Sequence, residues 1–167
     1  MITEVLNWGL QPKTVTTDSW YSSRENLKFL KNKDLGFLMG IAKNRSCSIN
    51  GREYTQVQNL EIPDEGLMVH LKTLGQVKVF QKNFKNEEKR YYILFDPNED
   101  ALITISRAEF QALHSIHWGI ECYHRAIKQV CGIEQFMVRT SQAIRTHFFS
   151  AIRAFTQLEL MRAVREA

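Results

Sequence analysis

The chain has 167 residues, of which 44% are hydrophobic, enough to form the core of one domain of usual size. Lys and Arg number 22 against 18 Asp and Glu, so the net charge is +4. This composition excludes an intrinsically disordered chain. The moderate basic excess is compatible with a polyanionic partner and does not by itself identify one.

The cysteines and the N-terminal residues indicate the cellular compartment of the protein. Cys47, Cys122 and Cys131 form no C-x-x-C pair, which favours reduced thiols inside a cell. The opening MITEVLNWGLQPK has neither a basic run nor a long apolar run, and no window reaches the apolar length of a membrane span. We therefore expect a cytoplasmic protein.

The N-terminal third predicts a strand, a helix and a second strand. A helical pattern in the first residues ends before Pro12, and KTVTTD reads as a short strand that ends on Asp18. The segment Ser22 to Glu25 matches a capping box and predicts a helix that runs to about Asn32. GFLMGIAKN then has the length and apolar character of a buried strand. This order leaves a carboxylate at the end of the first strand.

The middle of the chain, from Arg45 to Pro97, predicts hairpins. Asn50-Gly51 is a two-residue turn of the kind that joins paired strands, and residues 63–66 have turn chemistry. LMVHLKTLGQVKVFQ has two runs of period-two alternation about Gly75, and RYYILF follows as a further strand. This segment is predicted to be β-rich.

The last third predicts two long helices. After an expected loop at residues 96–100, Ser106 and Glu109 form a capping box, and Gly132 marks the end of the helix that this box begins. A last helix is expected to start at Thr140 or Ser141. Its predicted buried stripe is Ile144, Phe148, Ala151, Ile152, Phe155 and Leu158.

The first of these helices has an apolar face and a polar face about 120° apart. The polar face consists of His114, His117, Glu121, His124, Arg125 and Lys128. Solvated surface is one explanation, since Glu121 and Arg125 have the spacing of an ordinary ion pair. A helix-borne transition-metal site at His117, Glu121 and His124 is another. A catalytic role for Glu121 is the third.

Two segments resemble a known family. TVTTDSWYSSRENLKFL and HWGIECYHRAIKQVCGIEQFMVRTSQAIRTHFF are similar to the last two motif blocks of the DDE transposases of bacterial insertion sequences. The similarity is to the insertion-sequence-four-like branch with a W-x-I-E motif, here Trp118 to Glu121. Lys128 stands where the lysine of the family's Tyr-Arg-Glu-Lys signature would be, whereas His114 and His117 replace its Tyr and Arg.

The resemblance implies a fold and a chemistry. The fold would be α/β: a partial ribonuclease H-like sheet and helix over residues 1–44, a β-rich insertion over 45–100 that projects from the sheet, and C-terminal helices over 101–167. Asp18 and Glu121 would be catalytic carboxylates that bind Mg²⁺ or Mn²⁺ for DNA cleavage and strand transfer. DNA contacts are expected from Lys128, Arg125, His117, His114, Lys78, Lys82 and Lys85.

The resemblance also implies a missing group. The family uses an earlier Asp, and the only acid before Asp18 is Glu4. We therefore expect the C-terminal part of a transposase, inactive alone, with DNA and a second transposase copy as partners. It would be nucleoid-associated when bound to DNA. The alternatives are a catalytically dead DNA-binding or dimerising remnant and a metalloprotein unrelated to DNA. Trp20 and Tyr21 are expected to be packing residues rather than base-stacking groups.

Overall fold

The computed structural model describes residues 2–84 and 88–166. The chain separates into two compact units, an N-terminal unit, Met1–Ser115, and a C-terminal unit, Ile116–Ala167. The short helix α1 (Ile2–Asn7) opens the N-terminal unit. The long helix α4 (Arg107–Gln129) begins in the first unit and ends in the second.

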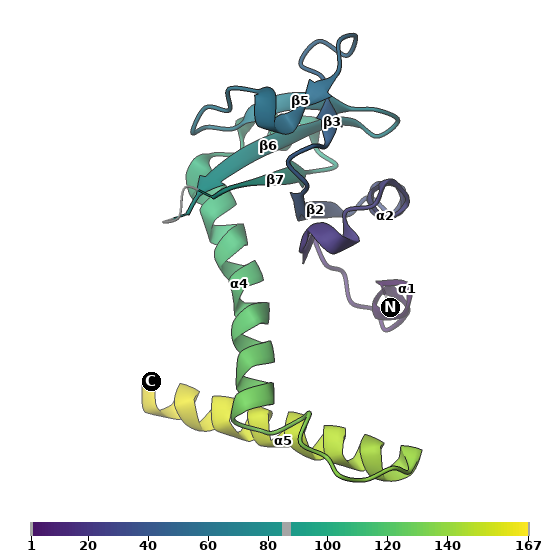
Figure 1. The fold of residues 1–167 in the computed structure, drawn as a ribbon, viewed down its shortest axis with the longest axis vertical. Helices are drawn as coiled ribbons and strands as arrows, with labels where there is room; N and C mark the ends of the chain where they lie inside the picture. The colour runs from purple at the N-terminus through teal and green to yellow at the C-terminus, as the bar shows by residue number, and fades with distance from the viewer. Residues whose placement is uncertain (1, 85–87, 167) are drawn as a thin grey trace. The chain divides into compact units, whose positions relative to one another are not determined.

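A five-stranded sheet with the order β1-β2-β7-β6-β5 forms the centre of the N-terminal unit (Figure 1). Its strands are β1 (Thr14–Thr17), β2 (Gly36–Ile41), β5 (Leu67–Leu71), β6 (Gly75–Asn83) and β7 (Lys89–Phe95). Strands β1 and β2 are parallel and are joined through α2 (Arg24–Lys31), while the other pairs are antiparallel. The predicted strand-helix-strand unit and the mixed α/β class are confirmed.

The start of α2 differs from the prediction by one residue. Ser23, not Ser22, is the N-cap, and its hydroxyl accepts a hydrogen bond from the Asn26 N–H at 3.2 Å. Ser22 instead closes the preceding 3₁₀ turn η1 (Ser19–Tyr21), because its hydroxyl donates to the Ser19 carbonyl at 2.8 Å. The tandem serines therefore have separate roles.

The predicted turn at residues 63–66 is confirmed, whereas the two-residue turn expected at Asn50-Gly51 is wrong, because residues 48–54 all connect β3 (Ser46–Cys47) to β4 (Thr55–Gln56). Gly51 and Gly66 have φ of +75° and +82°, a conformation that favours glycine. A side chain at Gly66 would also place its Cβ 2.8 Å from the Phe80 ring. The small hairpin of β3 (Ser46–Cys47) and β4 (Thr55–Gln56) is followed by the 3₁₀ turn η2 (Val57–Asn59). Gly75 is the first residue of β6 rather than the centre of its turn.

The expectation that the hairpins project from the sheet is wrong. Strand β7 pairs with β2 from Phe37↔Phe95 to Ile41↔Tyr91, and β6 pairs with β7 in turn. The apolar strand β2 is thereby paired along both of its edges, which satisfies its backbone groups and buries it. Strands β5, β6 and β7 extend the same sheet that contains β1.

Residues 96–100, expected to form a loop, already include the start of α3 (Glu99–Thr104). Asn98 caps this helix by accepting from the Ala101 N–H at 3.1 Å, and Leu102 buries its side chain in the core. The predicted capping box of α4 is confirmed, because Ser106 N–H donates to Glu109 at 2.7 Å and Glu109 N–H donates to Ser106 at 3.3 Å.

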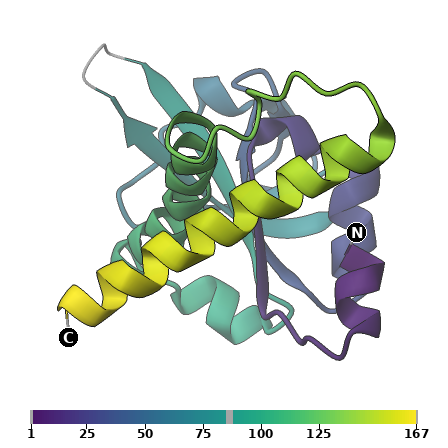
Figure 2. The same cartoon turned by 90° about the horizontal axis from the view of Figure 1, so that it is seen from below.

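The C-terminal unit contains the second half of α4 and the helix α5 (Ser141–Glu166). Tyr123 packs edge-on against Phe155 at 4.9 Å between ring centroids, and Phe136 packs against Phe148 at 5.6 Å. The segment between the helices runs alongside the first half of α5 (Figures 1 and 2). Gly132 has φ of +62° after the end of α4, as predicted, and Thr140 caps α5.

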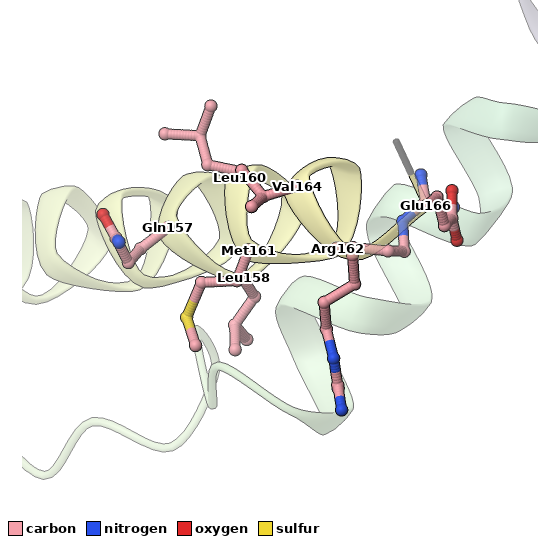
Figure 3. A pocket seen from close by; sticks show the side chains of 8 residues that line it. Gln157, Leu158, Leu160, Met161, Arg162, Val164 and Glu166 are labelled. Carbon is pink, nitrogen blue, oxygen red and sulfur yellow. The ribbon is translucent and has the colours of Figure 1, made fainter.

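The predicted buried stripe of α5 is largely uncovered: three of its six residues are exposed, Ile144 and Phe155 are partly buried, and Ala151 alone is buried. Only one helical partner, the second half of α4, packs on α5 within this unit, which is too little to cover a stripe of that length. A shallow hollow near the end of α5 is lined by residues of that one helix (Figure 3). Within residues 2–84 and 88–166, no helix has the length and apolar content needed to cross a membrane.

Candidate functional site

Asp18 is held in a defined turn at the carboxyl end of β1. It is the N-cap of η1, and its Oδ1 accepts a hydrogen bond from the Trp20 N–H at 3.0 Å. The Asn26 side chain donates to the Tyr21 carbonyl at 3.0 Å and ties the turn to α2. The carboxylate is exposed, so its second oxygen is accessible to a ligand.

Glycine in β2 allows this turn to approach the sheet. A Cβ at Gly40 would lie 3.2 Å from the Ser19 nitrogen and 3.5 Å from its Cβ. Because β1 and β2 are parallel, their carboxyl ends lie at the same edge of the sheet. Lys43 and Arg45, which follow β2, therefore belong to the edge that carries Asp18. Nothing in the local sequence marks these two cations as part of a site, because only the strand pairing relates them to Asp18.

Glu121 lies on α4 within the C-terminal unit and is exposed. Within the part of the chain that the structure describes, Glu121 and Arg125 do not form the expected ion pair. Lys128 of the same helix pairs with Glu134 instead. Trp118 and Ile120 of the W-x-I-E motif are also largely exposed, at 52% and 40%. Glu121 thus presents a carboxylate without an ionic partner, as a ligand for a cation would.

Lys128 forms an ion pair with Glu134, with 2.7 Å between Nζ and Oε1. Both side chains are about half exposed, and exposed pairs of this kind stabilise a protein by only about 0–1 kcal/mol. A phosphate could therefore replace Glu134 as the partner of Lys128 at small cost. Arg125 is exposed on the same helix.

His114 is buried, which differs from the surface role expected of it. Its Nε2 lies 3.2 Å from the Tyr92 hydroxyl and its Nδ1 lies 3.3 Å from the Lys82 Nζ. The ring also meets Tyr92 edge-on, with centroids 5.0 Å apart, and burial raises the pKa of Tyr92. These contacts give His114 a packing role between α4 and the sheet. His117 is partly buried, and a DNA contact by either histidine stays a prediction.

Lys78 is buried as well and has a structural role. Its Nζ donates to the carbonyl oxygens of Ile103 at 2.9 Å and Ile105 at 2.7 Å. These carbonyls lie at the end of α3, where the helix leaves acceptors without backbone donors. An ammonium group so engaged is poorly placed for a phosphate. Lys82 is partly buried, and Lys85 lies outside the described residues.

Replacement of Lys78 by Met is therefore expected to lower the free energy of unfolding by about 1–3 kcal/mol, since the carbonyls of Ile103 and Ile105 lose a charged donor. Urea unfolding measures this change, with Lys72→Met as the control on an exposed lysine in the turn between β5 and β6. The salt dependence of DNA affinity should stay as in the parent chain. A DNA-contacting Lys78 would instead show unchanged stability and a salt slope reduced by about 1.

Asp18 and Glu121 supply only part of the ligand set that a hard divalent cation needs. Mg²⁺ is commonly bound by one or two protein carboxylates together with phosphate oxygens, and Asp18 and Glu121 are exposed groups of that type. Among residues 2–84 and 88–166, no group of three or more His, Cys, Asp or Glu side chains is placed to hold a metal. His117, Glu121 and His124 are therefore not placed to hold a metal ion together. Asp18 and Glu121 lie in different units, and their convergence stays a prediction.

Comparison with protein families gives the identity of the chain. The family described as the transposase DDE domain matches residues 1–156, which include both candidate carboxylates. Searches of curated proteins and of solved structures found no match. Domains of this family act in DNA transposition, bind DNA and generally use divalent metal ions. Because the match covers most of its length, the chain belongs to the DDE transposase family.

Proposed function

We propose that the chain is the C-terminal catalytic segment of a DDE transposase, which cleaves transposon ends and transfers strands with Mg²⁺ or Mn²⁺. The observation that supports this most strongly is Asp18: an exposed carboxylate fixed at the carboxyl end of β1, inside the matched region. The branch is that of the insertion-sequence-four-like transposases with the W-x-I-E motif and the β-rich segment 45–100. The partial ribonuclease H-like sheet would include strands β5, β6 and β7 as well as β1 and β2, and helices within residues 101–167 would complete the domain.

Asp18 and Glu121 are the proposed metal ligands. Each carboxylate supplies hard oxygen donors, and the exposed Asp18 side chain has one oxygen on the Trp20 N–H and a second oxygen available to a cation. When bound, two divalent ions would activate the attacking oxygen and stabilise the leaving oxygen of an in-line displacement at phosphorus. The role of the protein is to hold these carboxylates and to orient the DNA.

Exposed cations would orient the DNA. Arg125 and Lys128 lie one and two turns after Glu121 on α4, where they can meet phosphates that flank the reacting one. Lys82 and Lys85 are candidates for weaker, non-specific contacts, while the buried Lys78 is not favoured. A second transposase copy is a proposed partner.

A third carboxylate is required from elsewhere. Within the 167 residues the only acid before Asp18 is Glu4, which lies in α1 rather than in the sheet. Strand β1 is the edge strand of the sheet, and its outer backbone groups could pair with one more strand. Such a strand would bring a carboxylate close to Asp18, so we propose that the 167 residues alone do not cleave DNA.

The experiment is a nicking assay on a supercoiled plasmid that carries the DNA flanking the coding sequence. The 167-residue chain should bind this DNA without nicking it in Mg²⁺ or Mn²⁺. The chain joined to a preceding transposase segment that supplies a strand with an aspartate should nick it. Binding without nicking by both proteins would favour the alternative function, a DNA-binding or dimerising remnant. Absence of any salt-sensitive DNA affinity would contradict both functions.

A further inference from the structure

The turn that follows Asp18 presents two aromatic side chains to solvent. Trp20 is 86% exposed and Tyr21 is 54% exposed, so the expectation that they are packing residues is wrong. An exposed indole loses the stabilisation of about 1.5–3 kcal/mol that burial of a large apolar side chain brings.

Several hydrogen bonds hold the backbone of the turn in place. The Trp20 N–H is bonded to Asp18, the Ser22 hydroxyl donates to the Ser19 carbonyl, and the Tyr21 carbonyl accepts from Asn26. The close approach of Ser19 to Gly40 holds the turn against β2. The backbone that carries Trp20 therefore has little conformational entropy to lose when the indole binds a planar ligand.

Cations lie at the same edge of the sheet. Lys43 is exposed and Arg45 is partly exposed, and within the described residues neither has an acidic partner. Their backbone is fixed, since the Arg45 N–H donates to Ala42 at 2.9 Å and the Gln58 N–H donates to the Lys43 carbonyl at 3.1 Å. Glu25, an acid in the first turn of α2, is already paired with Arg24 at 3.5 Å. The edge therefore combines exposed aromatic groups with unpaired positive charge.

We propose that Trp20, with Lys43 and Arg45, forms a binding site for an unpaired nucleotide next to the Asp18 carboxylate. Stacking on an aromatic side chain combined with phosphate contacts from cations is how proteins bind single-stranded nucleic acid. Bases of an intact duplex are stacked on one another and have no free face for Trp20, so the site selects a displaced or single-stranded nucleotide. The site deepens the proposed function, because it would hold the strand end on which the Asp18 site acts.

The test uses the full chain and short single-stranded oligothymidylate, with a duplex of the same length for comparison. In a chain carrying Trp8→Phe and Trp118→Phe, Trp20 is the only tryptophan, and its fluorescence should be quenched on titration with the single strand. Trp20→Ala should weaken single-strand affinity by about 5–150-fold, as expected for one stacked base. Duplex affinity should change less than about twofold, and Trp20→Phe should restore part of the loss.

The matched control is Trp8→Ala, since Trp8 is 74% exposed but lies away from Asp18 in the sequence, and it should leave both affinities unchanged. Lys43→Ala should weaken both affinities and reduce the salt slope. A Trp20 emission typical of a buried indole, or equal single-strand affinities for Trp20→Ala and the parent chain, would overturn the proposal. If the nucleotide site is overturned but the parent chain still binds duplex DNA, the transposase function stands. If the parent chain binds no DNA at all, both the nucleotide site and the transposase function are refuted.

Discussion

Glu121→Gln is expected to abolish metal-dependent nicking in the protein joined to the preceding segment, with a rate loss of at least about 1,000-fold. The amide keeps the shape of the side chain but is a poor ligand for a hard cation, and metal ions supply several kcal/mol of transition-state stabilisation. DNA affinity should change little, because Glu121 is exposed and contributes no positive charge. Plasmid nicking and a filter-binding titration measure the two effects.

Glu134→Gln is the matched control for Glu121→Gln. It removes another exposed carboxylate of the C-terminal unit, the partner of Lys128, and should leave the nicking rate near that of the parent protein. If Glu121→Gln nicks DNA as fast as this control, Glu121 is a solvated surface residue of an amphipathic helix and the catalytic assignment fails.

Phe110→Ala is expected to lower the free energy of unfolding by about 3–5 kcal/mol, the range for truncation of a buried phenylalanine. Phe110 is fully buried in the first turn of α4, where its ring stacks on Phe80 with 4.4 Å between centroids. Tyr92 lies against it at 5.7 Å, and the Arg107 guanidinium lies 5.2 Å from its ring. The substitution therefore leaves a cavity where α4 is anchored to the sheet.

Urea unfolding followed by circular dichroism measures the effect of Phe110→Ala. Phe149→Ala is the control, because Phe149 is 66% exposed on α5, and it should change the free energy of unfolding by less than about 0.5 kcal/mol. A Phe110→Ala variant as stable as this control would mean that α4 is not packed on the sheet through this residue.

The elements could be predicted from the sequence where local chemistry determines them. The alternation around β6, the turn at Gly66 and the capping box of Ser106 and Glu109 were identified correctly, because each depends on neighbours in the chain. The pairing of β7 with β2 was missed, since strand neighbours depend on contacts between distant segments. The same limit explains the buried stripe wrongly expected on α5, whose exposure depends on which elements cover it.

The candidate site could likewise be predicted only where neighbouring residues determine its structure. The position of Asp18 at a strand end follows from the local pattern, and the strand pairing confirms it. The role of Lys78 could not be predicted, because its partners Ile103 and Ile105 lie 25 and 27 residues away and are backbone carbonyls. The burial of His114 was missed for a similar reason, since Tyr92 and Lys82 reach it from two strands of the sheet.

The proposed function requires Asp18 and Glu121 to hold the same metal cluster. Iron-mediated cleavage of the polypeptide tests this requirement: Fe²⁺ replaces Mg²⁺ in the DNA-bound protein, and peroxide with ascorbate generates radicals that cut the chain next to the bound ion. We predict cuts near residues 18 and 121 together, both lost in Asp18→Asn. A cut near only one of these residues, or a cut near Glu121 that survives Asp18→Asn, would contradict a shared site.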